Sequence, residues 1–169
     1  MATSGSKSVT VTVVDELKFS WERTSYSVAN NTSTISWKME LIAGSSGRIS
    51  STASKDWEVT VNGTKYSGTN TIGISNNSTK TLASGSTTIS HNSDGTKSFS
   101  YSFSQYFGIT FSGSSINTKS GSGTGTLDSI PRQATITSAP NFNDEANPTI
   151  NYSNPAGNAV DALEACISF

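Results

Sequence analysis

The fold class is decided by residues 35–41, which read Ile35-Ser36-Trp37-Lys38-Met39-Glu40-Leu41. Apolar and polar side chains alternate here without a break. In an extended strand a period of two places the four apolar residues on one face and the three polar residues on the other. The stretch therefore predicts a β-strand with one buried face.

The same alternation recurs on both sides of this strand. It predicts further strands from Val9, Val11 and Val13 and from Leu17, Phe19 and Trp21, and a strand at Trp57, Val59 and Val61. Asn62-Gly63 follows the last of these and is a strong hairpin signal, so Lys65-Tyr66-Ser67 is expected to run back. Shorter strands are expected at Ile72, Ile74, Leu82 and Ile89.

The longest alternating stretch follows the turn at Asp94-Gly95. Its apolar positions hold one polar exception, Gln105, and Gly108 is expected to form a bulge or a bend; the apolar residues are Phe99, Tyr101, Phe103, Phe107, Ile109 and Phe111. Beyond Ile116, glycine occupies alternate positions 121, 123 and 125. Two interpretations are open. Glycine at these positions allows an aromatic ring or another backbone to approach the strand closely, or the run forms a flexible edge strand.

Composition supports an all-β chain. Ser, Thr, Gly and Asn make up half of the 169 residues, and charged residues are only 14%. Eight or nine strands precede Pro131, separated by turns at the spacing of a β-sandwich. We predict an antiparallel β-sandwich over residues 1–131, either immunoglobulin-like or jelly-roll. Residues 132–169 are expected to hold a linker and the start of a second, truncated β domain, with a strand from Val160 to Phe169.

Charge and cysteine content exclude several classes of partner. Residues 1–131 carry ten Lys and Arg against eight Asp and Glu, too little excess positive charge for phosphate-backbone binding. Cys166 is alone, so we expect no disulfide framework and no zinc site. The polar start predicts no secretory signal, and no apolar run reaches the length of a membrane span. We expect neither nucleic acid nor membrane as a partner.

The residues that could support catalysis are few. His91 is the sole histidine and is expected at the surface of a turn. Asp56, Glu58 and Glu40 alternate with apolar residues, as solvated carboxylates do, so a glycosidase-type pair is not expected. The Asp94-Gly95 turn lacks the alternating oxygen ligands that calcium requires. We predict no enzyme, no catalytic residue, no metal and no cofactor; a small hydrolase would need His91 or a carboxylate pair inside a cleft.

Exposed aromatic residues are the candidates for a binding site. Trp21, Trp37 and Trp57 are in phase with aliphatic neighbours and are predicted to be core. Tyr26 and Tyr106 are out of phase with the buried set and are predicted to contact carbohydrate or protein. Together with Ser, Asn and Gly, such tyrosines also form adaptable protein-binding surfaces.

Several blocks of the chain resemble a family of minor structural proteins of siphoviruses that infect Gram-positive bacteria. The resemblance covers residues 18–169 and is carried by residues 35–39, 57–68, 92–97, 103–113, 123–132 and 143–148. The Asp-Gly turn and Lys before an aromatic strand also look like immunoglobulin-like modules of phage tail proteins. Members of the family are several hundred residues long, which agrees with a truncated second domain.

The Ser/Thr/Gly/Asn-rich composition without a secretory signal predicts a virion protein that is assembled in the host cytoplasm. The resemblance implies a virion component located at the tail tip, baseplate or a fibre. It would bind other phage structural proteins and contribute to host adhesion, by interface burial and by pairing of edge strands such as residues 5–13. A homotrimer is expected. One alternative is a carbohydrate-binding module for host cell-wall polysaccharide, with Tyr26 and Tyr106 flanking a groove. Another is a head or neck fibre or decoration protein.

Overall fold

The computed structural model describes residues 3–132, 134–138 and 151–154. Ten strands lie within these ranges: β1 (Ser4–Thr10), β2 (Asp15–Ser27), β3 (Thr32–Ala43), β4 (Ser54–Val61), β5 (Thr64–Thr71), β6 (Thr79–Ser90), β7 (Lys97–Phe111), β8 (Ser114–Leu127), β9 (Thr135–Ser138) and β10 (Asn151–Ser153). Eight of them precede Pro131, as predicted. The described residues contain no helix.

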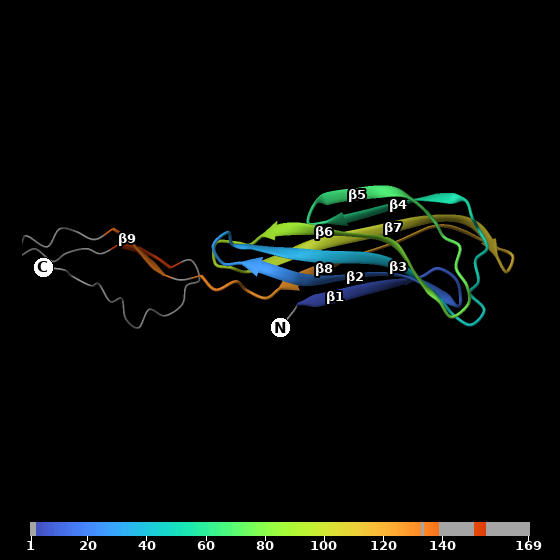
Figure 1. Ribbon diagram of the computed structural model, residues 1–169, viewed down its shortest axis with the longest axis horizontal. Coiled ribbons are helices and arrows are strands. Elements are labelled where there is room, and N and C mark those ends of the chain that lie inside the picture. The colour runs from blue at the N-terminus through green and yellow to red at the C-terminus, as the bar shows by residue number, and fades with distance from the viewer. Residues whose placement is uncertain (1–2, 133, 139–150, 155–169) are drawn as a thin grey trace, which may run out of the picture.

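The first eight strands form two four-stranded antiparallel sheets, in the orders β1-β2-β3-β6 and β5-β4-β7-β8. The sheets face one another (Figure 1), which confirms the predicted all-β antiparallel sandwich. β3 pairs with β6 in one sheet and β4 pairs with β7 in the other. The B–E and C–F pairs of immunoglobulin domains have the same arrangement, so the fold is immunoglobulin-like rather than a jelly roll. β1 is an added strand outside β2.

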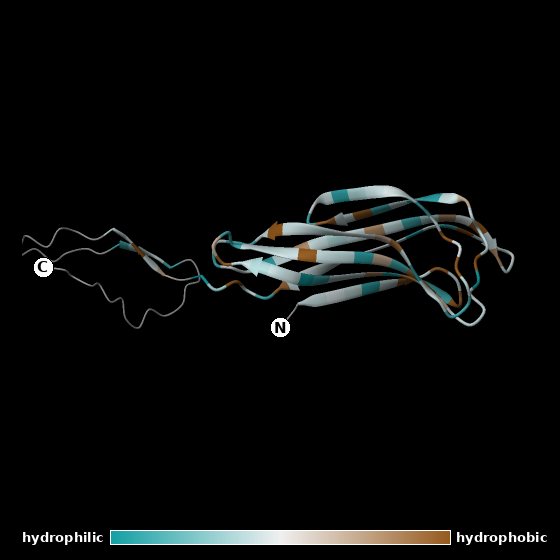
Figure 2. Ribbon diagram, in the orientation of Figure 1, coloured by the Kyte–Doolittle hydropathy of each residue, from teal (hydrophilic) through white to brown (hydrophobic). Residues whose placement is uncertain are grey.

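Alternation along the strands builds the core. Ile35, Met39 and Leu41 on β3 are completely buried, and Trp37 between them is 3% exposed. Figure 2 shows the resulting bands of apolar and polar residues along the strands. Across the interior the ring of Phe19 lies 4.9 Å from that of Tyr101 and 5.5 Å from that of Phe103, measured between centroids. Aromatic rings therefore join the two sheets.

A glycine lies directly opposite each of six core-facing aromatic residues on the neighbouring strand. The pairs are Gly5 with Trp21, Gly85 with Trp37, Gly68 with Trp57, Gly125 with Phe99, Gly123 with Tyr101, and Gly121 with Phe103. A Cβ built on Gly85 would lie 2.6 Å from Trp37 Cζ2, and one on Gly125 would lie 2.5 Å from Phe99. Each ring thus lies across its neighbour's backbone, and at every one of these glycines except Gly68 a Cβ would collide with the ring. Of the two predictions for the 121–125 glycines, close approach of a ring is confirmed.

The predicted strand over residues 5–13 ends early, at Thr10. The Thr12 hydroxyl accepts hydrogen bonds from the backbone N–H groups of Val14 and Asp15 and donates to the buried Asp15 carboxylate at 2.9 Å. This local network turns the chain, because it competes with the ladder for backbone donors. Val13, expected to be buried, is 93% exposed as a result.

Other segments also differ from the alternation. Ile72 and Ile74 are buried but lie in a connection, where Ile74 forms an isolated bridge with Ile49. Leu82 and Ile89 belong to one strand, β6, rather than to two short ones. Trp57 is only half-buried, because it lies on β4 beside the edge strand β5. The Asn62-Gly63 hairpin is confirmed, with φ of 49° and 81° at its two residues.

The start of β1 and the end of β8 lie side by side. The backbone N–H of Asp128 donates to Thr3 Oγ1 at 3.1 Å, and Arg23 donates to both the carbonyl and the carboxylate of Asp128. Eight antiparallel strands make this arrangement necessary, since an even number of passes along the sandwich returns the chain to its starting end. Figure 1 shows the free end of the sandwich on the opposite side.

The small sheet of β9 and β10 lies beyond the end of β8, within the region where a second domain is predicted (Figure 1). The strand predicted from Val160 to Phe169, together with Cys166, lies outside the described residues. Among the residues that the structure describes, none forms a helix with the length and apolarity needed to span a membrane.

We predict that Gly85→Ala lowers the free energy of unfolding by about 1–3 kcal/mol, because the new methyl group collides with the buried indole of Trp37. Gly68→Ala is the matched control. Its methyl group would lie 3.1 Å from Trp57, whose half-buried ring has room to shift, so a smaller loss is expected. Urea denaturation measures both variants. Equal losses of unfolding free energy in the two variants would contradict the idea that burial of the opposing ring determines the cost.

Candidate functional site

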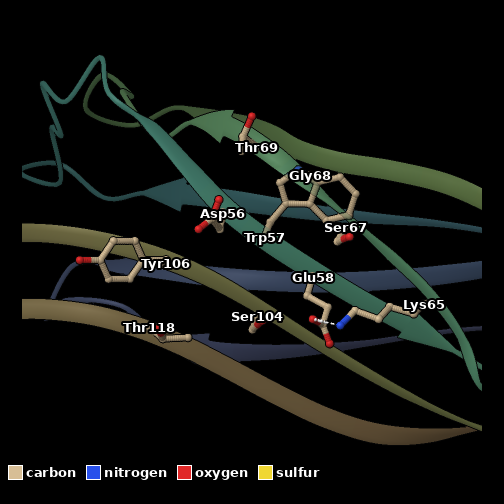
Figure 3. A pocket seen from close by; sticks show the side chains of 10 residues that line it. All are labelled: Asp56, Trp57, Glu58, Lys65, Ser67, Gly68, Thr69, Ser104, Tyr106 and Thr118. Carbon is tan, nitrogen blue, oxygen red and sulfur yellow. Dashed lines mark ion pairs between the residues drawn. The ribbon is translucent and has the colours of Figure 1, made fainter.

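A groove of about 660 Å³ lies on the outer face of the β5-β4-β7-β8 sheet (Figure 3). It crosses all four strands and is lined by Asp56, Trp57, Glu58, Lys65, Ser67, Gly68, Thr69, Ser104, Tyr106 and Thr118. Apart from Trp57 and Gly68, these residues are the outward-facing members of their strands. The groove therefore arises from the polar half of the alternation that builds the core.

Tyr106 forms one end of the groove and is 42% exposed. A bulge follows it on β7, where Gly108 adopts a φ of 55°. The tyrosine ring lies against this glycine, since a Cβ there would come within 2.7 Å of Tyr106 Oη. The Lys55 ammonium lies 5.4 Å from the ring centroid and donates to the Gly108 carbonyl at 3.3 Å. The bulge predicted at Gly108 is confirmed, and its effect is to orient Tyr106.

The groove carries two carboxylates, from Asp56 and Glu58 on β4. Glu58 forms an ion pair with Lys65 on β5, with side chains 45% and 61% exposed, and such exposed pairs add little stability. Asp56 forms no hydrogen bond or ion pair through its carboxylate with any described residue. One acceptor group in the groove is thus available to a ligand.

Gln105 lies directly behind the groove and is completely buried. Its side-chain amide donates to the carbonyls of Asp56 at 3.2 Å and Tyr106 at 3.0 Å. Its oxygen accepts a hydrogen bond from Asn70 at 2.9 Å, and Asn70 also donates to the carbonyl of Leu82, at the bulge of β6. Gln105, the one polar residue among the predicted inward-facing positions of β7, therefore fixes the backbone of two groove residues, Asp56 and Tyr106.

Tyr26, the other predicted contact residue, lies elsewhere. It is 53% exposed near the end of β2, in the other sheet, with the Arg23 guanidinium 5.1 Å from its ring. Contacts of Phe19 with Tyr101 and Phe103, and of Trp21 with Phe99, show that β2 and β7 run in opposite directions. Tyr26 and Tyr106 are thus at opposite ends of the sandwich, and they do not flank one groove.

His91 is buried, at 8% exposure, so the prediction of a surface residue is wrong. Its Nδ1 donates to the Gly95 carbonyl at 2.7 Å, because a carbonyl can only accept, and its Nε2 lies 2.8 Å from the hydroxyl of Ser33. Ile130 N–H also donates to Gly95 O. Like Ile89 two residues earlier, His91 points toward the core. Through Gly95, which also accepts from Ile130, it connects the 91–95 turn to the segment after β8.

A family model described as "Siphovirus protein of unknown function (DUF859)" matches residues 15–158. This range covers well over half of the chain. The chain belongs to this siphovirus family. The match includes β2 to β8, and with them every residue of the groove and the turn held by His91. The resemblance found in the sequence to siphovirus proteins is confirmed at the level of the family.

No curated protein matches the chain, and no solved structure matches it. Within the described ranges, no group of three or more His, Cys, Asp or Glu side chains is placed to hold a metal ion.

We predict that Gln105→Leu lowers the free energy of unfolding by about 1–3 kcal/mol, although leucine suits the apolar phase. The substitution leaves two carbonyls and one Asn70 donor without their partner in a buried site. Urea denaturation checks the value. A variant as stable as the parent would mean that the network contributes nothing.

We predict that Asp94→Asn weakens the loss of stability at low pH. Hydrogen bonds from the Thr96 hydroxyl, and then from the Thr96 backbone, lower the pKa of Asp94 below its ordinary value. A lowered folded-state pKa stabilises the fold above the unfolded-state pKa, and this contribution is lost as pH falls through the folded-state value.

The melting temperature measured between neutral pH and about pH 2 tests this, since unfolded Asp titrates near pH 4. The parent should lose more stability than Asp94→Asn below that pH. Parallel curves would contradict the assignment.

Proposed function

We propose that this chain is a structural component of the siphovirus virion, located at the tail tip, baseplate or a fibre, whose sandwich extends a surface toward the host. Membership of a siphovirus family supports the phage assignment. The observation that carries the proposal is that the chain begins β1 and ends β8 at the same end of the sandwich.

This geometry favours a projecting module. A domain joined to its neighbours at one end leaves the other end free, unlike a domain inserted in line. The free end is made of the connections at residues 11–14, 44–53, 72–78 and 112–113. β7 is 15 residues long, so the sandwich extends about 50 Å from its attachment.

The arrangement of the sheet edges suits assembly through strand pairing. β1 is an edge strand of the first sheet, and its polar residues leave it open to a partner strand. The two sheets touch along both sides of the sandwich: the start of β1 lies beside the end of β8, and Tyr66 Oη and Asn70 Nδ2 of β5 donate to carbonyls of β6. Pairing with other phage structural proteins, and trimer formation, are assigned in this proposal to the β1 edge.

The proposed mechanism is binding rather than catalysis. The hydroxyl of Ser33 and the ring of His91 form a hydrogen-bonded pair, but at 0% and 8% exposure both residues lie inside the sandwich, where a substrate does not reach them. Asp56 and Glu58 lie in an open groove on the outer face of a sheet, and Glu58 is paired with Lys65.

Immunogold electron microscopy of intact virions, with antibody raised against the sandwich, tests the location. We expect label at the tail tip, baseplate or fibre, because the projecting face is accessible there. Label on the capsid or neck would replace this proposal with a head or neck decoration protein. Absence of the chain from immunoblots of dissociated purified virions would overturn the virion assignment altogether.

A further inference from the structure

The groove on the β5-β4-β7-β8 sheet combines a flat exposed ring with hydroxyl groups and a carboxylate. The ring of Tyr106 is seen face-on in Figure 3, lying along the sheet at one end of the groove. An aromatic ring in this position offers an apolar surface beside polar groups. A sugar ring presents the complementary surface, with C–H groups on its face and hydroxyls around its rim.

The polar partners are arranged in a row across the four strands. Thr69 on β5 is the register partner of Asp56 on β4, and Thr118 on β8 is the register partner of Tyr106 on β7. Asp56 and Tyr106 lie one residue beyond the last β4–β7 pair, Trp57 with Gln105. Three strand spacings make the row about 14 Å long, which suits a chain of linked sugars better than a single one.

The charge of the groove lining favours neutral over anionic ligands. Asp56 and Glu58 are both acidic, and Lys65 is already paired with Glu58. The Lys55 ammonium beside the Tyr106 ring donates to the Gly108 carbonyl. A phosphate-bearing polymer would meet the unpaired Asp56 carboxylate and be repelled. Hydroxyl groups, in contrast, donate hydrogen bonds to a carboxylate, and such charge-assisted bonds are stronger than neutral ones.

The groove is held in place before any ligand binds. Gln105 donates to the carbonyls of Asp56 and Tyr106, the two residues at the centre of the row. Gly108 and Lys55 restrict the tyrosine ring. Side chains ordered in advance lose little entropy on binding, which matters for a shallow open site.

The outer face of the other sheet provides a contrast. A hollow of about 820 Å³ lies there over Ser6, Ser20, Lys18 and Lys38 among others, but its aromatic lining residues are Trp21 and Trp37. These rings are 5% and 3% exposed and face the core. That hollow has polar groups without an accessible ring, so the β5-β4-β7-β8 groove is the better site.

We infer that this groove binds a neutral, hydroxyl-rich polysaccharide, with Tyr106 stacking on a sugar ring and Asp56 accepting hydrogen bonds from its hydroxyls. The site would supply the host contact of the proposed virion function. Its binding can be measured on the isolated chain, so either proposal can fail without the other.

Affinity electrophoresis of the full 169-residue chain tests the inference, in native gels containing dextran, mannan, galactomannan or a glycerol-phosphate polymer. We expect at least one of the three neutral polysaccharides to retard the chain. Tyr106→Ala should weaken the apparent affinity at least tenfold, whereas Tyr106→Phe, which keeps the stacking ring, should stay within threefold. Asp56→Asn, which keeps one acceptor oxygen, should cost a few-fold.

Tyr26→Ala is the matched control, because Tyr26 is at least as exposed as Tyr106, is also contacted by a cationic side chain, and lies outside the groove. It should leave retardation unchanged. Failure of all three neutral polysaccharides to retard the chain would overturn the inference, as would retardation by the glycerol-phosphate polymer alone. An equal loss in Tyr26→Ala would also overturn it, because binding would then not depend on the groove. Circular dichroism of each variant verifies that the fold is retained.

Discussion

The packing of aromatic rings over glycine backbones is the constraint on which the sandwich depends. Bulky rings on facing strands fill the space between the sheets, and a ring that lies across the neighbouring strand needs that strand to have no side chain at that point. Gly121, Gly123 and Gly125 meet this need along three successive inward positions of β8. A shift of one residue would bring Ser122 and Thr124 beneath the rings, so the glycines also determine the strand register.

Because the inward-facing rings and glycines complete the core, the outward-facing positions of the strands can hold polar residues. The strands present serine and threonine to solvent because the core is complete without them, and the groove is formed entirely at such positions except for Trp57 and Gly68. Gln105 connects the two sides: it occupies an inward position, yet its hydrogen bonds hold the backbone of residues that face outward. Core packing and the binding surface therefore share one network.

The added strand β1 changes what an immunoglobulin-like sandwich can do. With seven strands such a domain has its termini at opposite ends, which suits a linear array. An eighth strand returns the chain to its starting end, where Arg23, Thr3 and Asp128 fasten the two chain segments together. His91 and Gly95 hold the segment that leaves the sandwich at the same end. The free end and the sheet faces are then available for contacts.

The local pattern of the sequence was sufficient to place most strands of the sandwich and the buried face of each of these, although not the connection that holds Ile72 and Ile74 or the single strand that holds both Leu82 and Ile89. Alternation at Ile35 to Leu41 and the Asn62-Gly63 hairpin depend on backbone geometry and neighbouring residues, so they are readable without the fold. The pattern failed at Val13, where side-chain hydrogen bonds of Thr12 end the strand, and at His91, where partners distant in sequence bury a polar ring.

Only part of the candidate site could be predicted from the sequence. Phase showed that Tyr26 and Tyr106 face solvent, but phase says nothing about which sheet a strand joins or which end of it a residue occupies. Strand order decided that Tyr106 lies beside Asp56 and that Tyr26 lies at the far end of the other sheet. Contacts between residues far apart in the chain depend on how the two sheets pair and pack, and this is settled only when the whole core assembles.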